Sequence, residues 1–129
     1  MKRALVIGAS GGIGTAISLE LSAQGYDVTG LSRSRDGLDI TDEASVAAAL
    51  GALNGPFAVI FVATGALEPG GHVPEKAVRE VTAPAMEAAF RVNAVGPTLV
   101  LKHSVRLLPK NEASVFAALS ARVGSISDN

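Results

Sequence analysis

The fold is decided near the start of the chain by the stretch Leu5-Val6-Ile7-Gly8-Ala9-Ser10-Gly11-Gly12-Ile13-Gly14-Thr15-Ala16. An apolar, β-branched run leads into a cluster of glycines, which opens directly into a segment compatible with a helix. Backbone N–H groups at the start of a helix have no partner within it, and the helix dipole adds roughly half a positive charge there. This pattern is typical of a turn that binds phosphate, because glycine lets the backbone approach a diphosphate closely. The alternative is a plain connection between a strand and a helix.

The spacing of these glycines resembles the motif of the short-chain dehydrogenase/reductase family. The usual dinucleotide fingerprint is G-x-G-x-x-G, whereas this chain has G-x-x-x-G-x-G. The family motif reads T-G-x-x-x-G-I-G, and only Ile7 departs from it, where the family usually has Thr. The resemblance implies that the cofactor is bound by Gly8, Ser10, Gly11, Gly12, Ile13 and Gly14.

The composition narrows the possible classes of protein. The 129 residues are 48% apolar and 18% charged, which predicts one domain (1–129) with a real core. With no cysteine, a net charge of −1 and few aromatic residues, the chain is not expected to hold disulfides or to bind nucleic acid. Its apolar runs are too short to cross a bilayer, and His72 and His103 lack the spacing of metal ligands. We therefore expect a cytoplasmic protein with no metal site, no membrane contact and no nucleic-acid partner.

Strand and helix patterns alternate along the whole chain. This alternation predicts an α/β fold of the Rossmann type, with a doubly wound parallel sheet in a three-layer α/β/α arrangement and the strand order 3-2-1-4-5. In such a sheet the ligand lies beyond the carboxyl ends of the strands. The expected strands are residues 3–7, 26–31, 37–40, 57–62 and 114–119, and the expected helices are 13–24, 42–53 and about 82–108.

The residues after the second strand favour NADP over NAD. An NAD site of this type places an acid there to accept a hydrogen bond from the ribose 2′-OH. This chain has Ser32 and Arg33, followed by Arg35. A carboxylate would repel the 2′-phosphate of NADP, whereas a guanidinium can bind it. Asp36 lies slightly late for the ribose and keeps NAD open, and the two arginines have the alternative of being solvated loop charges.

The ends of the third and fourth strands extend the resemblance. Asp39 and Ile40 match the family's Asp-Val/Ile pair beside the adenine, with a structural Asp near a helix start as the alternative. After the fourth strand the family has Asn-Asn-Ala-Gly, and this chain has Val62-Ala63-Thr64-Gly65, so only the glycine is kept. The resemblance implies that Ala63, Thr64 and Gly65 bring the backbone close to the cofactor's ribose.

Two candidates for the chemistry lie further along the chain. Pro97 has no N–H, so the carbonyl of Asn93 should lose its helical partner. The resemblance assigns that carbonyl a water beside the catalytic lysine, and a proline kink without a role is the alternative. The family's catalytic serine falls after the fifth strand, where Ser120 is the first candidate and Ser125 the second. A turn-capping role is open for both.

The family's Tyr-x-x-x-Lys dyad is absent, because the one tyrosine is Tyr26 at the start of a strand, with Gly30 four residues on. We interpret the chain as part of a longer enzyme of the C-factor and sniffer-like carbonyl reductase branch. The resemblance implies NADP-dependent hydride transfer with a small carbonyl or alcohol substrate, although the 129 residues alone are expected to be inactive. The alternative is a non-catalytic NADP-binding protein with a redox-sensing or regulatory role. The resemblance also implies a homo-dimer or tetramer formed through the long helix, with Val92, Val95 and Leu99 on its surface.

Overall fold

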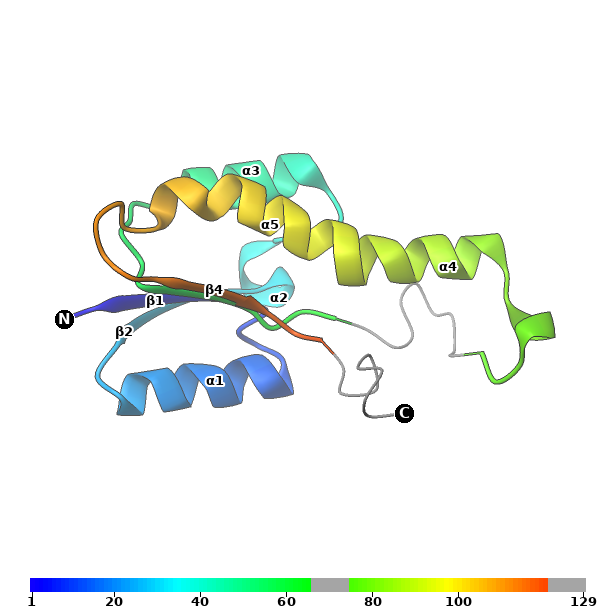
Figure 1. Cartoon of the computed structure of the whole chain (residues 1–129), viewed down its shortest axis with the longest axis horizontal. Coiled ribbons are helices and arrows are strands. Elements are labelled where there is room, and N and C mark those ends of the chain that lie inside the picture. Colours follow the sequence, from blue (N-terminus) through cyan, green and yellow to red (C-terminus); the bar gives the residue numbers. More distant parts are fainter. Residues whose placement is uncertain (66–74, 121–129) are drawn as a thin grey trace.

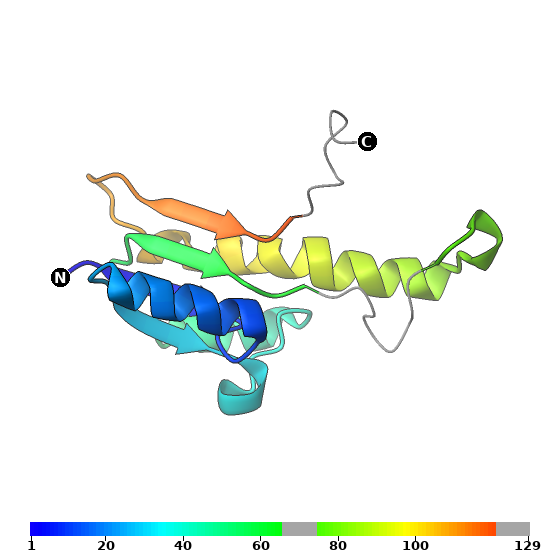
Figure 2. The same ribbon diagram turned by 90° about the horizontal axis from the view of Figure 1, so that it is seen from below.

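A parallel sheet forms the middle layer of three, with α1 on one face and α3 and α5 on the other (Figures 1 and 2). The computed structural model describes residues 1–65 and 75–120. The strands are β1 (Arg3–Ile7), β2 (Asp27–Leu31), β3 (Val59–Val62) and β4 (Val115–Ala118). The α-helices are α1 (Gly12–Ala23), α2 (Arg33–Asp36), α3 (Glu43–Gly51), α4 (Ala83–Phe90) and α5 (Gly96–Ser104), joined by the shorter helices η2 (Val78–Glu80), η3 (Arg91–Val95) and η4 (Val105–Leu107).

The sheet has the order β2-β1-β3-β4, with every neighbouring pair parallel. Leu5 and Ile7 of β1 pack with Val46 of α3 and Val100 of α5 in the main core. Alternate residues of a strand face opposite sides of the sheet, so Val6 faces the layer of α1 and is also fully buried. Burial on both faces is why β1 is apolar along nearly its whole length.

The predicted α/β fold with a Rossmann-type parallel sheet is confirmed. The strand order matches the expected one except at residues 37–40, which we predicted to form a strand and which form none. Local hydrogen bonds take the place of a ladder there: Asp39 N–H donates to the Ser45 hydroxyl at 2.9 Å, and the Ser45 hydroxyl donates to the Gly37 carbonyl at 3.3 Å. Side chains that bond nearby backbone in this way compete with sheet pairing. The segment therefore turns directly into α3, whose N-terminus is capped by Asp42.

The predicted long helix is not one regular α-helix. The chain passes from α4 through the π-helical turn η3 into α5, and α4 continues beyond the end of the sheet (Figure 1). Leu99 was predicted to lie on an exposed surface, but it packs against the core, while Val92 and Val95 are half-buried. Met86 and Phe90 are instead exposed on this stretch. Within the described part of the chain, no helix combines the length and the apolar character that crossing a membrane requires.

Candidate functional site

The turn between β1 and α1 is a close contact between two pieces of backbone. Gly8 has a φ of +84°, and its N–H donates to the Leu31 carbonyl of β2 at 2.8 Å. A Cβ on Gly14 would lie 1.9 Å from the carbonyl oxygen of Gly8. Glycine is therefore required at position 8 for its conformation and at position 14 for its missing side chain. This contact places the N-terminus of α1 at the carboxyl edge of the sheet.

The first turn of α1 faces open space. Its N-cap residue, Gly11, makes no side-chain capping bond, and a Cβ on Gly12 would meet no atom within 4 Å. Ile13, the next residue, is 55% exposed. The first N–H groups of an α-helix have no carbonyl four residues back to bind. They form a place where an anion can approach the backbone.

A chain of hydroxyl groups joins this turn to the end of β2. Ser34 Oγ donates to Ser10 Oγ at 3.2 Å, and it lies 3.4 Å from Ser32 Oγ. Ser32 is 1% exposed, and its hydroxyl accepts a hydrogen bond from Arg35 N at 3.1 Å. The structure thus brings Ser10 and Ser32, which are distant in sequence, into one polar cluster.

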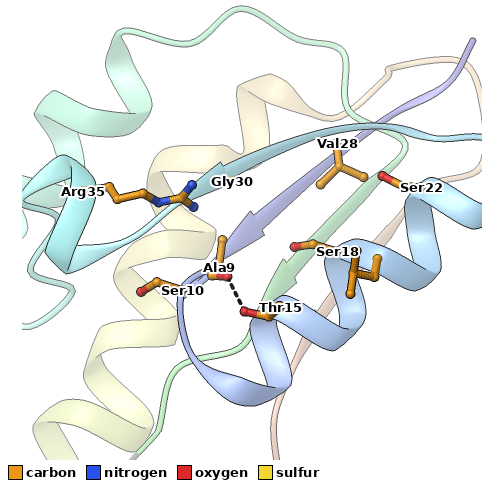
Figure 3. Close-up of a pocket in the computed structure, with 9 residues that line it drawn as sticks. Ala9, Ser10, Thr15, Ser18, Ser22, Val28, Gly30 and Arg35 are labelled. Atoms are coloured by element: carbon orange, nitrogen blue, oxygen red, sulfur yellow. Dashed lines mark hydrogen bonds between the residues drawn. The ribbon is translucent and has the colours of Figure 1, made fainter.

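The side chain of Arg35 contacts Ser32 in this cluster. Its Nε donates to Ser32 Oγ at 3.4 Å, and its Nη2 would be 3.4 Å from a Cβ on Gly30. Figure 3 shows the guanidinium directed toward Gly30, at one end of an open groove of about 540 Å³ between α1 and β2. A Cβ on Gly30 would lie 2.7 Å from the Cβ of Ala9, so the missing side chain at Gly30 makes room for Ala9 of the glycine turn. Ser32 and Arg33 are the residues that the sequence predicts for this site, and the structure adds Ser34 and Arg35, which belong to the same run of serines and arginines.

The carboxylate of Asp36 is hydrogen-bonded within the turn in which it lies. Its Oδ2 accepts a hydrogen bond from the backbone N–H of Ser32 at 2.7 Å. Gly37, with a φ of +66°, then ends the four-residue helix α2. The carboxylate that kept an NAD site open in the sequence therefore already has a structural partner.

Asp39 lies on the loop after α2, and its carboxylate is held by Thr41. Asp39 Oδ1 accepts hydrogen bonds from the Thr41 hydroxyl at 2.6 Å and the Thr41 N–H at 3.0 Å. These bonds, with a smaller contribution from the charge of Arg33, outweigh partial burial and hold the pKa of the Asp39 carboxyl below its usual value. Asp39 is thus a charged acceptor at neutral pH. The side chain of Ile40 packs on Gly96 in the core.

The Thr41→Val variant should raise the pKa of Asp39 and destabilise the protein in a pH-dependent way. An Asp whose pKa is lower in the folded than in the unfolded state stabilises the fold above about pH 4. This stabilisation is lost as the pH falls through the folded-state pKa. The difference in Tm between wild type and variant should therefore be present at pH 7 and should shrink as the pH falls through the lowered pKa of Asp39 in the folded protein. Carboxyl NMR titration and thermal unfolding across pH measure the two effects. Thr98→Val is the control, because the Thr98 hydroxyl donates to the Ala94 carbonyl, which does not titrate; an unchanged pKa of Asp39 would contradict the prediction.

The residues after β3 lie between the glycine turn and the π-helical turn. Ala63 N–H donates to the Ile7 carbonyl at 2.8 Å. Gly65 follows with a φ of +155°, and a Cβ on it would lie 3.3 Å from Asn93 Oδ1. The predicted candidates Gly65 and Asn93 are therefore neighbours, and the helix departs from α geometry at Asn93 as expected from Pro97.

The two serine candidates have different outcomes. Ser120 is exposed and follows β4 at the carboxyl edge. Ser125 lies outside the described residues. Within residues 1–65 and 75–120 there is no group of three or more His, Asp or Glu side chains arranged to hold a metal ion.

Comparison with known families accounts for this arrangement. The model of the NAD-dependent epimerase/dehydratase family matches residues 4–117. The chain belongs to this family. A search of curated protein sequences finds no significant match.

Solved structures relate this member of the epimerase/dehydratase family to short-chain dehydrogenases/reductases. One such protein from Burkholderia multivorans, with bound NADP, is 26% identical with a TM-score of 0.85; the alignment covers 100% of this chain and 63% of that one. A short-chain alcohol dehydrogenase from the same organism is 26% identical with a TM-score of 0.83, covering 99% and 66%. A small-chain dehydrogenase in complex with NADPH is 28% identical with a TM-score of 0.75, covering 92% and 50%.

The resemblance to short-chain dehydrogenases/reductases is thereby confirmed. The chain spans less than two-thirds of the length of these proteins. Its assignment to the C-factor and sniffer-like branch stays a prediction.

Proposed function

We propose that this chain binds NADP(H) at the carboxyl edge of its sheet, as the cofactor-binding part of an oxidoreductase of the short-chain dehydrogenase/reductase type. The observation that supports the proposal is that the N-terminus of α1 and a cluster of serines with Arg35 lie side by side at this edge. The open N-terminus of α1 offers backbone N–H groups to a diphosphate. The cluster of Ser10, Ser32, Ser34 and Arg35 beside it offers hydroxyls and a guanidinium to a 2′-phosphate.

Each part of the edge has a role in this proposal. Gly8, Gly11, Gly12, Ile13 and Gly14 form the turn that receives the diphosphate. The carboxylate of Asp39 accepts from the adenine amine, and the backbone at Ile40 and at 63–65 lines the nucleoside. From the family resemblance, the Asn93 carbonyl would hold a water beside the catalytic lysine, and Ser120 would steady a substrate carbonyl. When bound, the nicotinamide supplies or accepts a hydride.

The substrate proposed for the whole enzyme is a small carbonyl or alcohol compound. The two similar Burkholderia proteins, a short-chain dehydrogenase/reductase and a short-chain alcohol dehydrogenase, support this class. A homo-dimer or tetramer is proposed from the same family resemblance, and a cytoplasmic location from a sequence without cysteine. Light scattering on the purified protein tests the oligomer, and a monomeric mass would remove that part.

The position of the tyrosine favours a second candidate function, a non-catalytic NADP-binding protein. Tyr26 is the one tyrosine in the 129 residues. It precedes β2, at the opposite end of that strand from Ser32 and the proposed site. Tyr26 therefore cannot exchange a proton with a substrate there. In this reading the chain binds a dinucleotide, and among residues 1–65 and 75–120 no tyrosine lies at the proposed site to exchange a proton during hydride transfer.

Equilibrium titration with NADP and NAD tests the proposal. We expect NADP to bind at least about tenfold more tightly than NAD, because a charge-assisted phosphate contact contributes roughly 1.5–3 kcal/mol. A parallel assay should find no NADPH oxidation by the 129-residue chain with aldehyde or ketone substrates. Equal affinity for the two dinucleotides would contradict the NADP assignment, and turnover by the isolated chain would contradict the prediction of inactivity.

A further inference from the structure

Thr64 carries a buried hydroxyl that nothing in the described part of the chain satisfies. Its Oγ1 makes no hydrogen bond among the described residues. Buried polar groups in folded proteins nearly always have partners, and an unpaired one destabilises the fold. The unpaired hydroxyl of Thr64 therefore suggests a partner that is bound only when the site is in use.

The surroundings of Thr64 connect it to the proposed cofactor site. Its Cγ2 would lie 3.0 Å from a Cβ on Gly8, so its methyl group packs against the start of the glycine turn. The next residue, Gly65, lies against the side chain of Asn93 in the π-helical turn. Thr64 therefore stands between the two segments that frame the carboxyl edge at β3.

The Thr64 side chain can turn its hydroxyl toward a ligand without breaking a hydrogen bond to the described residues. The residue as a whole is only half-buried, although its oxygen is covered. Rotation about the Cα–Cβ bond moves the hydroxyl and the methyl group between staggered positions. Since Oγ1 has no hydrogen bond among the described residues, such a rotation would break none there and would bury a methyl group in its place.

We propose that the Thr64 hydroxyl hydrogen-bonds to the bound dinucleotide and gains there the partner that it lacks in the unliganded chain. A sugar hydroxyl or a diphosphate oxygen has the matching chemistry. The inference rests on the proposed NADP function and deepens it. The family motif has Ala at this position, which has no polar side chain, so the contact would be a feature of this chain.

Thr64→Val tests the inference with two independent measurements. The variant keeps the shape of the side chain and removes the hydroxyl. We expect its Kd for NADP to rise about 3- to 10-fold, the loss of one hydrogen bond. We expect the Tm of the unliganded protein to rise by a few degrees, because a methyl group replaces an unpaired buried hydroxyl. Unchanged NADP affinity, or a fall in Tm, would overturn the inference.

Two control variants and a second ligand sharpen the result. Thr64→Ser keeps the hydroxyl and should bind NADP within about twofold of wild type. Thr98→Val makes the same replacement at an exposed threonine and should leave NADP affinity unchanged. Adenosine 2′,5′-bisphosphate locates the contact: weaker binding of both ligands by Thr64→Val assigns it to the adenosine half, and weaker binding of NADP alone assigns it to the nicotinamide half. If wild type binds no NADP, the proposed function fails; if wild type and Thr64→Val bind it equally, only this inference fails.

Discussion

Gly14→Ala is expected to destabilise the protein by about 3 kcal/mol or more and to abolish NADP binding. The added Cβ would lie 1.9 Å from the carbonyl oxygen of Gly8 and 2.8 Å from its carbonyl carbon. Both atoms belong to backbone, which cannot rotate away as a flexible side chain would. The helix must therefore move off β1, and the turn that presents its N-terminus is lost. Thermal unfolding should show Tm lower by roughly 10 °C or more.

Gly12→Ala is the matched control for this prediction. A Cβ on Gly12 would meet no atom within 4 Å, so we expect a Tm close to that of wild type. The methyl group would nevertheless occupy the space in front of the first turn of α1, where the diphosphate is proposed to lie. NADP affinity should therefore fall at least about tenfold without loss of stability, as expected when a phosphate is held off the backbone. A stable Gly14→Ala variant, or a Gly12→Ala variant with normal NADP affinity, would contradict this account of the turn.

The glycine turn shows what the sequence alone could predict. The order of strand, turn and helix follows from local composition, and so do the cap at Asp42 and the break in helix geometry near Pro97. These features depend on residues a few positions apart. The structure adds a steric reason for Gly14, because a Cβ there would lie 1.9 Å from the carbonyl oxygen of Gly8. Local patterns therefore sufficed for the fold class and for the place of the glycine turn between β1 and α1.

The features that sequence reasoning missed depend on contacts or competition that composition does not reveal. The pattern Gly37-Leu38-Asp39-Ile40 reads as a strand, but Ser45 and Thr41 supply hydrogen bonds that make it a turn. The sequence predicts Leu99 on the surface of the long helix, yet its side chain packs against the core. Asp36 could be read as a ribose ligand until its bond to Ser32 N was known. In each case the structural role of the residue depends on the atoms that it contacts, and the residue type alone does not reveal them.

Arg35→Ala is expected to weaken NADP binding about 10- to 100-fold and to change NAD binding less than about threefold. The guanidinium of Arg35 is oriented by Ser32, whose hydroxyl lies 3.4 Å from that of Ser34. A charge-assisted contact with a phosphate contributes roughly 1.5–3 kcal/mol, and NAD lacks the phosphate that would receive it. Arg33→Ala should have a smaller effect, because the guanidinium that is hydrogen-bonded to Ser32 in the serine cluster belongs to Arg35. Titration of each variant with both dinucleotides measures the change in selectivity.

The control for Arg35→Ala must separate a local contact from a change in net charge. Arg79→Ala on η2 removes the same charge from a segment outside the cluster and should leave both affinities unchanged. Higher salt should weaken NADP binding more than NAD binding in wild type, and this difference should shrink in Arg35→Ala, because the screened interaction has been removed. If Arg33→Ala gives the larger loss, the 2′-phosphate is held by Arg33. If both arginine variants keep the preference for NADP, the cluster after β2 does not bind the 2′-phosphate. The selectivity for NADP over NAD would then come from other residues at the carboxyl edge of the sheet.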